Sequence, residues 1–152
     1  MLFAISIIFV SINNIFSFFN FLSPAQAQSV INLTQTGCQF IETEAKNYGY
    51  QPQKAVDCRQ INQDSLAVRE KGFKPINLKA GKYVFKVTNQ NVPYELGFYL
   101  RGQGLSQAVL PRVSGGGLTT GKTIEYIADL KKGKYWISCP LNPTPDYPLI
   151  VN

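Results

Sequence analysis

Hydrophobic and polar residues alternate along much of the chain with the two-residue period of β-strands. In the segment 82–89, KYVFKVTN, the side chains of Tyr83, Phe85 and Val87 share one face of an extended chain. The segment 123–130, TIEYIADL, alternates in the same way. Further strands are expected at residues 29–35, 76–78, 94–100, 105–111, 135–139 and 149–151, and a glycine-rich loop at 114–121. Short strands separated by Gly, Pro and Asn turns predict an all-β domain, an antiparallel β-sandwich.

A single helix is expected, and it precedes most of these strands. The segment 58–72, CRQINQDSLAVREKG, places Ile61, Ser65 and Leu66 on one side of a helix, and Gly72 is a stop signal. We therefore divide the chain into an N-terminal extension, residues 28–74, which holds the helix, and a β-sandwich, residues 75–152.

The first 22 residues carry no charge and are mostly apolar. Ala25 and Ala27 flank Gln26 in the small-x-small pattern of a signal-peptidase site, which predicts that residues 1–27 are a signal peptide cut before Gln28. The usual positively charged start is missing, so the alternative is an uncleaved anchor. A membrane is expected as a partner only in that second case. Both outcomes make this an exported protein.

The three cysteines are consistent with one disulfide and one remaining thiol. Cys38 and Cys58 lie close together in the same polar N-terminal region, which favours a Cys38–Cys58 bond. Closing that loop stabilises the fold by about 3 kcal/mol in the chain-entropy description. Cys139 is then the remaining thiol.

The chain has 15 basic and 9 acidic residues and a net charge of +6. This excess is compatible with an acidic partner or an anionic lipid surface. The lysines are scattered along the sequence, however, so we interpret the charge as a contribution to solubility. No nucleic-acid-binding module is recognisable.

Catalytic chemistry has little support in the sequence. The chain contains no histidine, which excludes Ser–His–Asp and Cys–His arrangements. Gly116, Gly121, Lys122 and Thr123 match the phosphate-binding pattern G-x-x-x-x-G-K-[ST]. That motif needs a strand before the loop and a helix after it, whereas residues 123–130 have the β-branched and aromatic content of a strand. We interpret the match as a coincidence.

The C-terminal segment 133–152, GKYWISCPLNPTPDYPLIVN, has a cysteine at the end of an expected strand, then a proline-rich loop and a final strand. The earlier segment 87–98, VTNQNVPYELGF, contains a turn rich in Asn and Pro. In this layout residues 76–152 resemble the cupredoxins, the small blue copper proteins that include plastocyanin. The resemblance implies a Greek-key β-sandwich. It also implies the periplasm or a thylakoid lumen as the exported location, with the extracellular space still open.

The resemblance covers the layout but not the metal ligands. Cys139 stands at the copper-thiolate position, while Tyr94 and Asn142 stand where the family has its two histidines. Met1 is the only methionine, so the axial ligand has no counterpart either. A type 1 site needs two neutral imidazoles and one thiolate, and a phenol and an Asn carbonyl are poor substitutes. The resemblance therefore implies a domain with no cofactor.

The main functional hypothesis is a non-catalytic module that binds a protein partner or a small ligand. The copper end of the family is also its docking end, so the resemblance implies a docking surface that contains Tyr94, Asn142, Pro143, Pro145 and Tyr147. The alternative is an atypical copper-binding or electron-transfer protein that uses Cys139 together with Tyr94 and Asn142.

Three interpretations of Cys139 itself stay open. The thiol packs as a small apolar group at a strand end, or it contributes to weak binding of a soft metal such as Cu(I). In the third interpretation it is redox-sensitive or pairs with a partner thiol.

Overall fold

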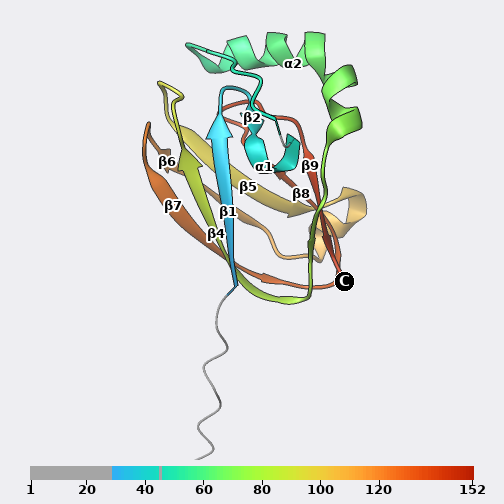
Figure 1. The fold of residues 1–152 in the computed structure, drawn as a ribbon. Helices are drawn as coiled ribbons and strands as arrows, with labels where there is room; N and C mark the ends of the chain where they lie inside the picture. Colours follow the sequence, from blue (N-terminus) through green and yellow to red (C-terminus); the bar gives the residue numbers. More distant parts are fainter. Residues whose placement is uncertain (1–28, 45) are drawn as a thin grey trace, which may run out of the picture.

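The computed structural model of this chain describes residues 29–44 and 46–152. Two β-sheets face each other, and one helix lies across an end of the pair (Figure 1). The signal peptide expected at residues 1–27 lies outside the described residues. Within the described part of the chain, no helix is long and apolar enough to span a bilayer.

The first sheet has four strands in the order β2-β1-β4-β7. Their bounds are Ser29–Thr36 (β1), Gln39–Phe40 (β2), Gly81–Asn89 (β4) and Thr123–Leu130 (β7). Strand β4 runs antiparallel to β7 and parallel to β1, with Ser29 opposite Tyr83 and Gln35 opposite Asn89.

The second sheet has five strands in the order β3-β9-β8-β5-β6. Their bounds are Ile76–Leu78 (β3), Leu96–Gly102 (β5), Val113–Leu118 (β6), Gly133–Ser138 (β8) and Tyr147–Val151 (β9). Strand β3 is parallel to β9, and the other pairs in this sheet are antiparallel.

The two parallel pairs change the expected picture in part. The predicted sandwich-like, mostly β fold is confirmed, but purely antiparallel sheets are wrong. A parallel pair needs a long crossover connection, and the chain between β1 and β4 provides it. That connection contains α1 (Ile41–Glu44), α2 (Ala55–Arg69) and the 3₁₀ turn η1 (Glu70–Gly72).

The helix is therefore part of the folded domain, and its expected place in an N-terminal extension is wrong. In the chain, α2 follows β1 and β2 and precedes β3 and β4. The expected inward residues Ile61, Ser65 and Leu66 are only half-buried, whereas Cys58 and Arg69 are buried. The helix is thus attached by a disulfide and an ion pair rather than by an apolar stripe.

Two segments between β5 and β7 differ from the sequence prediction. Residues 105–111 were expected to be a strand, but Gly104–Ala108 forms the 3₁₀ turn η2, with Leu105 98% exposed. The expected loop at 114–121 contains most of strand β6, which pairs with β5. Pairing overrides the low strand propensity of glycine here. At Gly115 glycine is also required, because a Cβ atom would lie 2.8 Å from Cε1 of Tyr126.

The core fills the space between the sheets. Aromatic side chains from both sheets meet there: the rings of Phe85 and Phe98 lie 5.5 Å apart, and those of Phe98 and Tyr126 lie 5.1 Å apart. Tyr83, Phe85 and Val87, which were expected to share one face of β4, are all buried and face this core.

Candidate functional site

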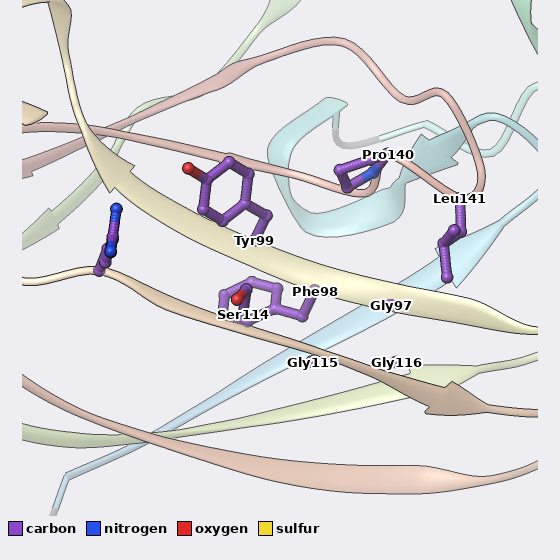
Figure 2. Close-up of a pocket in the computed structure, with 9 residues that line it drawn as sticks. Gly97, Phe98, Tyr99, Ser114, Gly115, Gly116, Pro140 and Leu141 are labelled. Atoms are coloured by element: carbon purple, nitrogen blue, oxygen red, sulfur yellow. The ribbon is translucent and has the colours of Figure 1, made fainter.

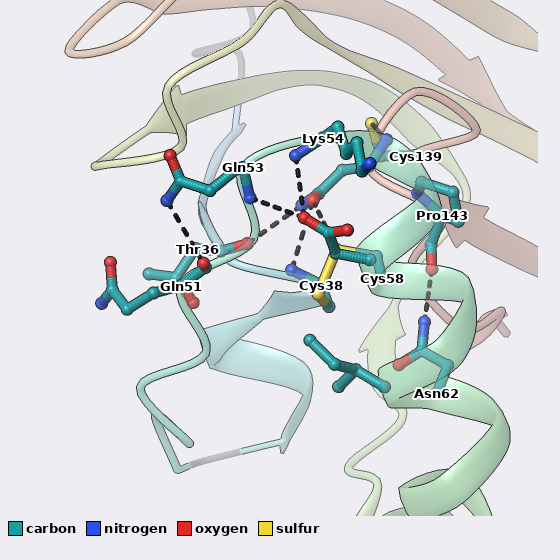
Figure 3. The surroundings of a disulfide bond; sticks show 12 residues. Thr36, Cys38, Gln51, Gln53, Lys54, Cys58, Asn62, Cys139 and Pro143 are labelled. Atoms are coloured by element: carbon teal, nitrogen blue, oxygen red, sulfur yellow. Dashed lines mark hydrogen bonds between the residues drawn. A yellow bond between two sulfur atoms is a disulfide. The ribbon is translucent and has the colours of Figure 1, made fainter.

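The predicted Cys38–Cys58 disulfide is present, and it ties α2 to the turn between β1 and β2 (Figure 3). Cys38 has a left-handed backbone conformation, with φ of 63°. The preceding Gly37 leaves no space for a side chain, because a Cβ atom would lie 2.3 Å from the carbonyl oxygen of Tyr50. The chain that leads into α2 therefore packs closely on this turn, and the helix starts directly over the end of the sandwich.

A buried ion pair fixes the other end of the helix. Arg69 Nη2 lies 2.5 Å from Glu44 Oε1, and both side chains are 1% exposed. Arg69 Nε also donates to Glu44 Oε2 at 2.9 Å. Tyr147 donates its phenol proton to the same carboxylate, and burial together with that negative charge raises the pKa of Tyr147. Breaking such a pair on one side leaves an uncompensated buried charge.

Asn142 lies beneath this attachment and is fully buried. Its Nδ2 donates to the carbonyl of Thr36 at 2.9 Å, and its Oδ1 accepts from the Cys38 N–H and the Tyr94 hydroxyl, both at 3.2 Å. The Cys58 Sγ lies 3.3 Å from the same oxygen. A disulfide sulfur carries no hydrogen, so this last approach is a contact rather than a hydrogen bond. Both the nitrogen and the oxygen of the carboxamide therefore have partners within the protein.

Cys139 is a free, buried cysteine next to Asn142. Its Sγ accepts the backbone N–H groups of Gly97 and Asn142, each at 3.2 Å. Burial raises the pKa of the thiol, and these hydrogen bonds offset the rise only in part. The group therefore stays a neutral thiol at physiological pH.

The structure thus brings together the three residues that the resemblance assigns to the copper ligands. Tyr94 contacts Asn142, and Asn142 contacts Cys139. These residues do not fit a type 1 copper centre, because a phenol and a carboxamide stand in place of its two imidazoles, and the amide oxygen faces a disulfide. Nor do three His, Cys, Asp or Glu side chains gather as a metal-binding group anywhere in residues 29–44 and 46–152.

The expected docking surface is buried for the most part. Asn142 and Tyr147 have no exposed surface, and Pro145 is also buried, so these three members of the expected docking surface are not accessible to a partner. Tyr147 points inward because its hydroxyl reaches Glu44. Tyr94 and Pro143 are half-buried, and the Pro143 carbonyl accepts from Asn62 of α2 (Figure 3).

An open cleft lies beside this closed site, on the outer face of the second sheet (Figure 2). Its volume is about 530 Å³, and its lining residues come from β5, the start of β6 and the loop after Cys139. Gly97, Gly115 and Gly116 leave its floor without side chains, while Tyr99, Pro140 and Leu141 stand at its edge. Arg112 adds a positive charge.

Sequence reasoning missed this cleft. The signal was the run of glycines at 115–117, which we interpreted as a loop because glycine disfavours strands. A glycine-rich strand also marks a place where a ligand or another backbone approaches closely. Tyr99 and Arg112 carried no distinctive pattern of their own.

The nucleotide-like motif has no phosphate-binding geometry. Gly116 lies in strand β6, and Thr123 begins strand β7. The two strands are joined by a short turn, so no helix N-terminus follows the Lys122–Thr123 pair, as a phosphate site requires.

Comparison with known proteins gives no relative from which a function is transferable. No family model matches the chain, and no curated protein matches its sequence.

Protonation behaviour tests the burial of this site. Burial raises the pKa of Cys139 above its ordinary value of 9.0, and burial with the nearby Cys139 and Asp57 raises that of Tyr94 from 10.0 to about 12. Folding thus favours the neutral form of both groups. Their contribution to stability is complete below the unfolded-state pKa values and is lost as the pH rises through the folded-state values. We expect the free energy of unfolding, measured with urea, to fall above pH 9.0.

Two variants separate the contributions. Cys139→Ser removes the part of the fall in unfolding free energy that begins at the lowest pH. Tyr94→Phe removes a part of the fall that begins at higher pH. A profile whose alkaline slope is the same in the wild type and in both variants contradicts the burial described above.

Proposed function

We propose that this protein is an exported, non-catalytic binding module with a cupredoxin-like Greek-key sandwich that has lost the type 1 copper ligands. One observation carries the proposal: Cys139, Asn142 and Tyr94 have their polar atoms engaged by other groups of the protein. Because these polar atoms already have partners within the protein, we propose that the domain acts by binding a partner rather than by binding a metal.

The disulfide supports the exported location. Disulfides persist in oxidising compartments and are rare in the cytosol. The bond between Cys38 and Cys58 and the apolar segment 1–22 are both consistent with the periplasm, a thylakoid lumen or the extracellular space.

The open cleft is the best binding surface. Its floor, formed by Gly97, Gly115 and Gly116, carries no side chains, and Tyr99, Pro140 and Leu141 offer apolar contact to a side chain. Arg112 at the same cleft favours an acidic group. We therefore propose that the partner is a protein segment bound in extended form, with an apolar residue close to an acidic one.

The alternative function is an atypical copper-binding or electron-transfer role for Cys139 with Tyr94 and Asn142. The softness of a thiol for Cu(I) favours it. The raised pKa of the buried Cys139 opposes it, because the thiolate is the metal-binding form.

Copper titration distinguishes the two functions. We expect the purified oxidised protein to show no intense visible charge-transfer band with Cu(II) and no retained Cu(I) after dialysis. Cys139→Ser should then leave metal uptake unchanged. One copper retained per chain, and lost in Cys139→Ser but not in the surface variant Thr119→Ala, contradicts the proposal in favour of the alternative.

Peptide selection tests the cleft directly. We expect a displayed library of random peptides to yield binders that combine an apolar with an acidic residue. Ser114 is exposed on β6 and lines the cleft, so Ser114→Trp fills it and should weaken the selected peptides at least roughly tenfold, about 1.4 kcal/mol. Arg112→Gln keeps most of the shape and should weaken them roughly threefold.

Thr119→Trp is the matched control, since it adds the same bulk at an exposed turn outside the cleft. Titration calorimetry on the wild type and the three variants gives the affinities. Equal weakening by Ser114→Trp and Thr119→Trp, or no selected binder at all, rejects the cleft as the binding surface.

A further inference from the structure

Lysines that are scattered in sequence gather at one end of the sandwich. The end lies opposite α2 and is formed by the turns that join β3 to β4 and β7 to β8. Strand register brings these turns together, because Gly81 is opposite Leu130, and both Leu78 and Gly133 are opposite Val151. Five exposed lysines lie here, and we call this surface the lysine end: Lys79, Lys82, Lys131, Lys132 and Lys134. Asp129, opposite Lys82, is outnumbered.

Exposed apolar side chains lie next to these lysines. Turn η2 is attached to the β7–β8 turn, because the Gln103 N–H donates to the Lys134 carbonyl at 2.9 Å and Leu110 packs against Gly133. Leu105 on this turn is 98% exposed, and Val109, the residue directly after it, is 75% exposed. Neither side chain packs into the core, so the fold of the domain does not explain why these apolar groups are exposed.

The N-terminal segment joins the domain at the same end. Strand β1 begins at Ser29, which is opposite Tyr83, one residue after Lys82. Figure 1 shows that β1 starts at the end of the sandwich where the C-terminus lies, away from α2. The segment that precedes Ser29 includes 22 uncharged, mostly apolar residues.

We propose that the lysine end docks on the surface of an anionic lipid bilayer, with Leu105 and Val109 entering the interface. Basic residues near an anionic surface and apolar side chains at the headgroup level are the two contributions that bind peripheral proteins to membranes. An acidic protein partner would account for the lysines but not for the protruding Leu105 or for the place where the apolar segment joins. This surface is separate from the cleft, and docking there turns α2 away from the membrane.

Vesicle binding tests the proposal with residues 29–152. Both sheets, the disulfide and the core described above lie within this segment, so it carries the folded unit, and cooperative unfolding is verified first. The probes are vesicles of phosphatidylcholine alone and of phosphatidylcholine mixed with phosphatidylglycerol. We expect the protein to sediment only with the anionic vesicles and to be released by high salt.

A charge-matched pair of triple variants locates the surface. Lys131→Gln/Lys132→Gln/Lys134→Gln should weaken binding to the anionic vesicles roughly a hundredfold, since each lysine near the surface contributes about fivefold. The control, Lys46→Gln/Lys54→Gln/Lys122→Gln, removes the same charge at the end that α2 covers and should change binding far less.

Insertion of η2 is tested separately. Leu105→Trp should show a blue shift of tryptophan fluorescence with anionic vesicles that the wild type, whose single tryptophan is Trp136, does not show. Leu105→Ser should weaken binding several-fold without changing the midpoint of unfolding.

Three outcomes overturn the proposal. They are no sedimentation with anionic vesicles, equal weakening by the two triple variants, and binding to soluble polyglutamate without binding to vesicles. The last result would identify an acidic macromolecule as the occupant of the lysine end.

Discussion

The bond between Cys38 and Cys58 is the constraint on which the rest of the site depends. It holds the start of α2 against the β1–β2 turn and places a sulfur atom 3.3 Å from the Asn142 carboxamide. The Arg69–Glu44 pair fixes the other end of the helix. The helix buries few apolar side chains, so these two attachments rather than hydrophobic packing keep it over the end of the sandwich. Through Cys58 the helix covers Asn142, whose backbone N–H in turn donates to the Cys139 thiol.

This enclosure gives the two ends of the domain different properties. At the end under α2, polar atoms of Tyr94, Asn142 and Cys139 are paired within the protein. The accessible surface beside it is the cleft with a glycine floor. The opposite end exposes lysines and the side chain of Leu105. A protein that rests on a membrane through the second end would present the cleft to the surrounding solution. Recognition and localisation would then use separate surfaces on the same small sandwich.

Strand periodicity located most of the β-structure, because strands such as β4 and β7 have one buried face. It failed at β6, because the glycines there disfavour a strand and only the pairing with β5 makes one. It also failed at η2, because the apolar residues there are exposed. The disulfide was predictable from sequence proximity. The lysine end was not predictable from the sequence, because only the strand register brings residues 79–82 and 131–134 together. The burial of Tyr147 was also hidden, because it depends on Glu44, a carboxylate 103 residues away.

The accessibility of the Cys139 thiol tests the enclosure most directly. The rate of its alkylation by iodoacetamide can be followed by mass spectrometry in the oxidised protein and in the Cys38→Ser/Cys58→Ser variant, both under native conditions. The account predicts that Cys139 reacts only through rare opening in the oxidised protein and much faster once α2 is released. Rapid alkylation of Cys139 with the disulfide intact would contradict it.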